Sequence, residues 1–159
     1  MEILGTFGSP CRYHWLIAAL GILAPVLFAC STPHARQGPA SPALLPVCPD
    51  SPNCVSSQAK DSRRRVDPIR FTGPSGSAWS RLRRVIEGMK RARITDGTDG
   101  YLHVEVRSAV FGFVDDVEFL MDAGGSRIDV RSASRTGHYD FGANRRRVEE
   151  IRARFAREP

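Results

Sequence analysis

The chain has 159 residues, of which 25% are charged and 42% are hydrophobic, and its formal net charge at pH 7 is +6. This length suits one small domain, and no internal repeat indicates a solenoid or a propeller. A basic chain attracts anionic membrane surfaces and other polyanions, while its charge says nothing about the fold. Nucleic acid, the usual partner of such a chain, is not expected here because the N-terminus indicates export.

The N-terminus has the features of a signal peptide. An apolar run of fourteen residues, Leu16 to Ala29, follows the single basic residue Arg12. Such a run is too short to cross a bilayer comfortably and has the length of a signal-peptide core. We therefore predict that residues 1–29 are a signal peptide. Its removal takes away Arg12 and Glu2 together, so the remaining chain keeps its net charge of +6.

The apolar run ends in Leu27-Phe28-Ala29-Cys30, which resembles the lipobox of bacterial lipoproteins. The resemblance implies cleavage before Cys30 and attachment of lipid, including palmitate, to its sulfur. The protein would then be anchored in the bacterial cell envelope and face the periplasm. Ser31 follows the cysteine in place of an aspartate, which slightly favours the outer membrane. An ordinary cleaved signal with a chance cysteine, or an uncleaved anchor, are the alternatives.

The next segment is expected to be a flexible tether. Residues 31–46 contain four prolines and no acidic residue. They also have few large apolar side chains, so burial cannot offset the entropy of ordering them. We therefore assign residues 30–46 to the lipidated cysteine and its tether, and residues 47–159 to a single domain.

Cys48 and Cys54 bracket five residues, of which two are prolines. In an oxidising compartment two such neighbours are expected to form a disulfide, which would stabilise the fold by about 2 kcal/mol in the chain-entropy model. A zinc site would need two further ligands, and His103 and His138 have no paired spacing. A redox role is the other alternative. We expect no metal and no other cofactor.

Two segments have helical periodicity. The first follows Ser77, a plausible N-cap, and its apolar positions recur every three or four residues: Trp79, Leu82, Val85, Ile86 and Met89. The second begins at about Asn144, which is a good capping residue, and presents Val148, Ile151 and Phe155 on one face.

Between the helices lie three segments in which apolar and polar residues alternate, residues 101–108, 115–122 and 127–134. This alternation is typical of half-buried strands, and a shorter strand at residues 92–95 is expected to lead them. The order predicts an α+β fold, with an antiparallel four-stranded meander and two helices packed on one face.

The other sheet face is then predicted to be charged, since alternation places these residues on it: His103, Glu105, Arg107, Asp116, Glu118, Asp129 and Arg131. The simplest interpretation is a solvated face with cross-strand ion pairs, each worth less than about 1 kcal/mol. Alternatively, carboxylates on it bind a divalent cation or act as acid and base. Asp115 and Asp116 cannot converge, because adjacent residues of a strand point to opposite faces, but Asp116 and Glu118 share a face.

Residues 131–147, RSASRTGHYDFGANRRR, join the last strand to the last helix. A structural interpretation pairs Arg135 with Asp140, lets Ser132 and Ser134 bond to the local backbone, and makes Asn144 the helix cap.

A functional interpretation uses the same stretch as an anion site, formed by backbone N–H groups at the helix start and by nearby arginines, including Arg146. Arginines at a helix start repel one another and need a compensating acidic group, from Asp140 and Glu118 or from a ligand. A serine hydrolase built on Ser134 and His138 is not favoured, because no nucleophile elbow is present. The candidate ligand-binding residues are therefore Arg131, Ser132, Ser134, Arg135, Asp140, Asn144 and Arg145.

Four motifs, CPDSPNCVSS, DPIRF, FVDDVEF and RSASRTGHYDFGANRRRVEEIR, resemble in that order the bacterial and plastid family called domain of unknown function 1499. The resemblance covers about residues 46–157 and implies a small domain, often exported or membrane-associated, with no established activity. His138 and Tyr139 do not match the family pattern. The positions that match are Cys48, Pro49, Pro52, Asn53, Cys54, Ser57, Asp115, Asp116, Glu118, Arg131, Ser132, Ser134, Arg135, Gly137, Asp140, Gly142, Asn144 and Arg145.

Two classes of function remain open. The first is a non-catalytic envelope module, held at the membrane by lipid, that binds an anionic ligand or an acidic protein partner. The second is a small hydrolase-like enzyme that uses Asp116, Glu118 and Asp140. An enzyme requires these carboxylates to converge in a concave pocket, whereas arginines that are all paired at a flat joint favour the module.

Overall fold

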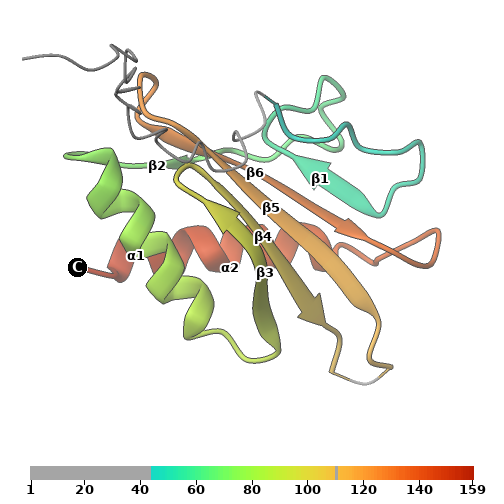
Figure 1. The fold of residues 1–159 in the computed structure, drawn as a ribbon. Coiled ribbons are helices and arrows are strands. Elements are labelled where there is room, and N and C mark those ends of the chain that lie inside the picture. Colours follow the sequence, from blue (N-terminus) through green and yellow to red (C-terminus); the bar gives the residue numbers. More distant parts are fainter. Residues whose placement is uncertain (1–43, 110) are drawn as a thin grey trace, which may run out of the picture. The chain divides into compact units, whose positions relative to one another are not determined.

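The computed structural model describes residues 44–109 and 111–159. The predicted signal peptide, Cys30 and almost all of the predicted tether lie outside these residues. The described chain contains, in order, β1 (Cys54–Ser56), β2 (Ile69–Arg70), α1 (Ser75–Glu87), β3 (Ala92–Thr98), β4 (Tyr101–Arg107), β5 (Val114–Asp122), β6 (Arg127–Ser134) and α2 (Ala143–Arg157) (Figure 1).

The strands form one six-stranded antiparallel sheet in the order β1-β6-β5-β4-β3, and β2 also pairs with β6. The predicted four-stranded meander is present as β3 to β6, and two short strands that were not predicted, β1 and β2, extend the sheet to six strands. β1 pairs with residues 131–133 of β6 and β2 with residues 127–128, so the two short strands share its outer edge. Three residues and two residues are too few to show an alternating pattern.

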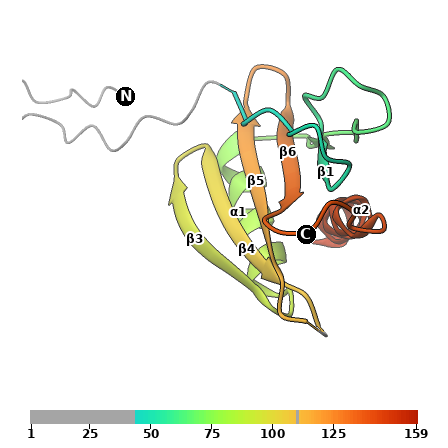
Figure 2. The same cartoon turned by 90° about the vertical axis from the view of Figure 1, so that its right-hand side faces the viewer.

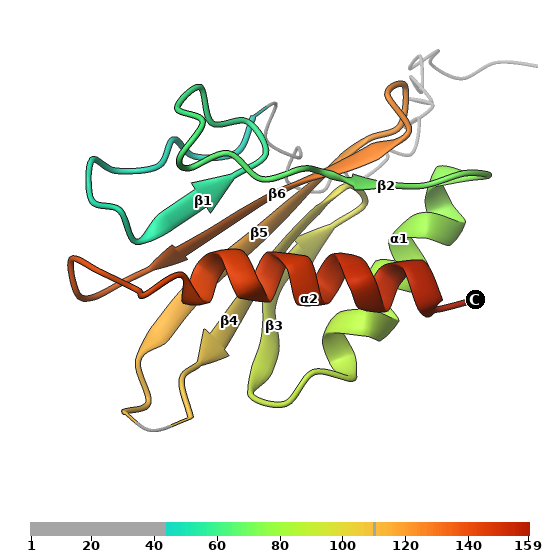
Figure 3. The ribbon, with the colours of Figure 1, turned by 180° about the vertical axis from the view of Figure 1, so that it is seen from behind.

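Both helices lie on the same face of the sheet, as Figure 1 and the view from behind in Figure 3 show. The predicted alternation is confirmed, because Leu102, Val104, Val117, Phe119 and Val130 are all 0% exposed beneath the helices. They form one core with the apolar side of both helices, from Ala78 to Ile86 in α1 and from Val148 to Phe155 in α2. The α+β class follows from this two-layer arrangement.

The first helix begins earlier than predicted. Ser77 was expected to be the N-cap, but α1 starts at Ser75 and the preceding residue is Pro74, whose φ of −65° suits a helix start. No side chain caps this end. No helix among the described residues has the length and apolar character needed to cross a membrane.

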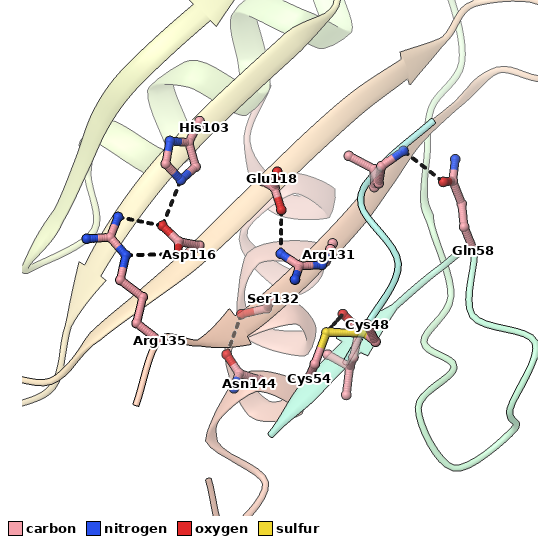
Figure 4. Close-up of polar contacts among 12 residues, drawn as sticks. Cys48, Cys54, Gln58, His103, Asp116, Glu118, Arg131, Ser132, Arg135 and Asn144 are labelled. Atoms are coloured by element: carbon pink, nitrogen blue, oxygen red, sulfur yellow. Dashed lines mark hydrogen bonds and ion pairs between the residues drawn. A yellow bond between two sulfur atoms is a disulfide. The ribbon is translucent and has the colours of Figure 1, made fainter. Parts of the chain in front are cut away.

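The disulfide between Cys48 and Cys54 is present, as predicted (Figure 4). The chain just before it packs on the domain, since Leu45 is buried. The Leu45 backbone N–H donates to the side-chain oxygen of Gln58 at 3.1 Å, and Gln58 in turn donates to Asp129 at 2.9 Å. The packed part of the described chain therefore includes Leu45.

The loop between β4 and β5 projects beyond the end of the sheet, as the two views in Figures 1 and 2 show. β3 and β5 begin at this end, and β4 and β6 finish at it, because neighbouring strands are antiparallel. The loop from β6 to α2 therefore starts at the same end.

Candidate functional site

The serines and the asparagine of the strand-to-helix joint form a buried polar cluster. Ser132 and Asn144 are both 0% exposed, and the Ser132 hydroxyl donates to the Asn144 side-chain oxygen at 2.6 Å. The Asn144 amide donates to the Asn53 carbonyl at 2.8 Å and to the Ser134 hydroxyl at 3.0 Å. Asn144 therefore fastens α2 to β6 and to the residue before β1, and the buried side chains of Ser132 and Asn144 are not open to a ligand.

A buried ion pair completes this cluster. The Arg147 guanidinium donates to the Asp115 carboxylate, to the Ser132 hydroxyl at 2.9 Å and to the Asn144 side-chain oxygen at 2.6 Å. The two charged side chains are only 11% and 8% exposed. Sequence reasoning missed Arg147, although its spacing of three residues from Asn144 and four from Ile151 places it beside the buried face of the helix.

The start of α2 is capped by Asp140 and not by Asn144. The Asp140 carboxylate accepts the backbone N–H of Gly142 at 3.0 Å and that of Asn144 at 2.8 Å. Gly142, directly before the helix, has a φ of 76°, a left-handed conformation that favours glycine. The predicted cap was wrong because the Asn144 side chain already lies within the first turn and points into the interior.

Arg135 pairs with Asp116 and Glu105, so the expected Arg135–Asp140 pair was wrong. Its guanidinium donates to both oxygens of Asp116, at 2.7 and 2.9 Å, and to Glu105 at 2.7 Å. These partners lie on β5 and β4, so Arg135 lies over the open face of the sheet, opposite the helices (Figure 4). The predicted binding residues are thus divided between two faces.

His103 extends the same network. One ring nitrogen lies 2.7 Å from Asp116 Oδ1 and the other lies 2.9 Å from the Thr95 hydroxyl. Hydrogen bonds from Arg135, more than that from His103, lower the pKa of Asp116, and the Arg135 hydrogen bond likewise lowers the pKa of Glu105. The two carboxylates in turn raise the pKa of Arg135. These contacts stabilise the charged forms of Asp116, Glu105 and Arg135, as expected for structural ion pairs.

Arg131 lies beside this network and pairs with Glu118, and Glu118 also accepts the Tyr101 hydroxyl at 3.1 Å. The two charged side chains are 13% and 9% exposed. Burial, together with the charge of Glu118, raises the pKa of Tyr101 to about 12. The predicted charged face is therefore present as a set of cross-strand pairs, since Glu118 lies opposite both His103 and Arg131 in the sheet.

The three carboxylates of the proposed enzyme are held by separate donors. Arg135 and His103 bind Asp116, Arg131 and Tyr101 bind Glu118, and backbone N–H groups bind Asp140. The described residues contain no group of three or more His, Cys, Asp or Glu that could hold a metal ion.

A hollow with a volume of about 910 Å³ lies at the other end of the sheet. It is lined by the first described residue, the start of α1 and two strand turns, and none of the candidate ligand-binding residues reaches it. Ser134 and His138 are not paired either, since His138 packs edge-on against Tyr139 with ring centroids 4.7 Å apart. This hollow therefore does not gather the three carboxylates of the proposed enzyme, Asp116, Glu118 and Asp140.

Arg145 has a different role from Arg131 and Arg135. It donates to the backbone carbonyls of Arg63 at 2.7 Å and Arg65 at 2.9 Å, and Arg146 beside it donates to the Phe141 carbonyl at 2.7 Å. Carbonyl groups satisfy these donors but leave the positive charges uncompensated. Arg63, Arg65, Arg145 and Arg146 thus form an arginine patch, which brings together two arginine runs about eighty residues apart in the chain.

The model of a family described as "Protein of unknown function (DUF1499)" matches residues 44–155. No curated protein matches the sequence. The matched range takes in both faces of the sheet, the polar joint and the arginine patch.

Proposed function

This chain belongs to the family of proteins of unknown function DUF1499, and we propose that it is a non-catalytic module of the bacterial cell envelope that binds an anionic ligand or an acidic protein partner. Lipid on Cys30 would hold it at a membrane on the periplasmic side, with the outer membrane slightly favoured. The lipobox-like motif supports the anchor, and the arginine patch supports the binding.

The arginine patch is the observation that carries the binding proposal. Arg131 and Arg135 each have carboxylate partners, but within residues 44–109 and 111–159 Arg145 bonds to backbone carbonyls and to no carboxylate, which leaves its charge for an outside anion. The Arg63 side chain is 88% exposed, and its carboxylate partner is Asp61 at 3.3 Å. Guanidinium groups suit carboxylates and phosphates, which accept paired hydrogen bonds, and the backbone contacts of Arg145 bring two arginine-rich segments together.

The hydrolase-like alternative has weaker support. Acid–base catalysis needs a carboxylic acid with a raised pKa near a second carboxylate, whereas Arg135 lowers the pKa of Asp116 and both of its oxygens are occupied. Asp140 is used to cap a helix.

Thermal melting with two anionic probes, pyrophosphate and polyglutamate, tests the binding proposal. The protein used is the chain from Ser31, which contains the whole core between Val55 and Phe155 and lacks the predicted anchor. We expect at least one probe to raise the melting temperature. Replacing Arg63 and Arg65 by Gln should weaken that binding by about 1 kcal/mol, roughly fivefold in affinity.

The matched control replaces Arg70 and Arg93 by Gln, which removes the same amount of positive charge from exposed positions on β2 and β3. It should keep most of the stabilisation by the probe. If both double variants lose the same amount of probe affinity, the net charge of the protein and not the arginine patch is responsible. If neither probe raises the melting temperature of the parent protein, the proposal is contradicted.

A further inference from the structure

Two aromatic rings are exposed side by side on the projecting loop between β4 and β5. Phe111 is 76% exposed and Phe113 is 54% exposed, and their ring centroids are 5.6 Å apart. Neither belongs to the hydrophobic core. Single exposed apolar residues are common, but a pair on a projecting loop marks a surface that contacts something else.

The loop is closed by its own hydrogen bonds. The Ser108 backbone N–H donates to the Phe113 carbonyl at 2.8 Å, and the Phe113 N–H donates to the Ser108 hydroxyl at 3.0 Å. Gly112 between the two rings has a φ of 67°, which turns the chain at the tip in a conformation that favours glycine. The fold therefore presents the two rings outward together.

Three exposed basic residues lie at the end of the sheet from which this loop projects. Lys90, Arg91 and Arg107 are exposed where β3 begins and β4 ends, and the Arg107 N–H donates to the Arg91 carbonyl at 3.0 Å. Within the described part of the chain, no salt bridge engages any of these three side chains. The loop from β6 to α2 adds two more exposed aromatics at this end of the sheet, Tyr139 at 68% and Phe141 at 89%.

Exposed aromatic rings and exposed cations at one end of the sheet match the chemistry of an anionic bilayer surface. Phosphates and acidic headgroups attract the cations, and the rings enter the boundary between headgroups and acyl chains. A protein partner would need a shaped hollow to receive a narrow projecting loop, whereas a bilayer needs none. The charge and the shape of the tip together favour lipid.

We propose that the β4–β5 loop is a membrane-contact site, at which Phe111 and Phe113 insert into an anionic lipid surface while Lys90, Arg91 and Arg107 bind its headgroups. This site lies on a different loop from the arginine patch and does not require lipid on Cys30. It would fix which end of the domain faces the membrane.

Vesicle sedimentation of the chain from Ser31 tests the proposal. The protein should bind vesicles of phosphatidylcholine mixed with phosphatidylglycerol, and bind vesicles of phosphatidylcholine alone much less. Replacing Phe111 and Phe113 by Ser should lower partitioning to the anionic vesicles by roughly tenfold or more. The matched control is Leu44→Ser, which removes a 71% exposed apolar residue beside the hollow at the opposite end of the sheet and should bind like the parent.

Fluorescence of the Phe113→Trp variant gives an independent measurement. The chain from Ser31 has one native tryptophan, Trp79, which is 8% exposed and supplies a constant background. Anionic vesicles should shift the emission of the new indole to the blue, and brominated lipids should quench it, while the Leu44→Trp variant should show neither change.

Equal binding of the parent and the double serine variant, or an unshifted spectrum of Phe113→Trp, would overturn the proposal. The double serine variant should keep the response to whichever probe, pyrophosphate or polyglutamate, stabilises the parent protein, so the two proposals fail separately.

Discussion

Burial and the neighbouring carboxylate of Glu118 both oppose the ionisation of Tyr101 on the open face of the sheet. Burial of the phenol raises its pKa, and the neighbouring carboxylate raises it further, to about 12 from an ordinary value of 10.0. The folded state therefore holds the phenol proton more tightly than the unfolded state does. The stability that follows from this is fully present below pH 10.0 and is lost as the pH rises to about 12.

We predict that Glu118→Gln lowers the pKa of Tyr101 toward 10.0, because it removes the negative charge that opposes ionisation. Ultraviolet titration of the phenols in the chain from Ser31 measures this directly. Only two tyrosines, Tyr101 and Tyr139, are present in it, so Tyr101→Phe should abolish the late step and Tyr139→Phe should keep it. An unchanged late step in Glu118→Gln would show that burial alone is responsible.

The pair between Arg147 and Asp115 should be the most costly ion pair to break. Asp115→Ala leaves a buried guanidinium without its carboxylate, and we expect a loss of about 3 to 5 kcal/mol in the free energy of unfolding. The control, Glu149→Ala, breaks an exposed pair with Arg152 and should cost less than about 1 kcal/mol. Urea unfolding measures both, and similar losses would contradict the assigned burial of the Arg147–Asp115 pair.

At the level of elements, the start of α2 depends on a residue outside the helix. Asp140→Ala removes the acceptor of two backbone N–H groups and should cost about 0.5 to 2 kcal/mol, whereas Asp140→Asn keeps one acceptor oxygen and should lose less. A double-mutant cycle between Asp140 and Arg135 should give a coupling energy near zero, because Arg135 binds Asp116 and Glu105 instead. A large coupling would restore the pairing expected from the sequence.

The edge of β6 shows how short elements depend on longer ones. β1 and β2 contribute three and two residues, which could not remain ordered alone. β1 is held by the disulfide of Cys54 and by the Asn144 amide, which bonds to the carbonyl of Asn53 directly before it. An otherwise unpaired strand edge is thereby covered, which protects the sheet from pairing with another chain.

For the whole molecule, the proposals combine a lipid anchor with a domain that touches the bilayer. Cys30→Ser should move the protein from the membrane fraction toward the soluble fraction, because it removes the sulfur that we propose to be acylated. Adding Phe111→Ser and Phe113→Ser should complete this release if the β4–β5 loop retains some protein on anionic lipid. Cell fractionation with acyl-chain labelling measures both, and full membrane retention of the triple variant after signal removal would contradict lipidation.

The sequence by itself determined the main elements and their faces. β6 occupies the predicted residues 127–134, and the alternation along it places Ile128 and Val130 beneath the helices and Arg131 on the open face. The close spacing of Cys48 and Cys54 also led correctly to the disulfide. These features could be predicted because side-chain direction repeats every two residues in a strand, and because both cysteines lie in one short segment.

Only the tertiary structure decided which charged groups meet. The partners of Arg135 are nineteen and thirty residues away in the chain, and the carboxylate partner of Arg147 is thirty-two residues away. Arg145 binds backbone carbonyls that lie eighty and eighty-two residues before it. Sequence reasoning placed Arg135 with the nearest acid, Asp140, because it could weigh only local separations. Strand register and helix docking set these distances, and neither is contained in a short window of sequence. The same reason explains why the anion site that we propose lies at the arginine patch and not at the whole of the predicted joint.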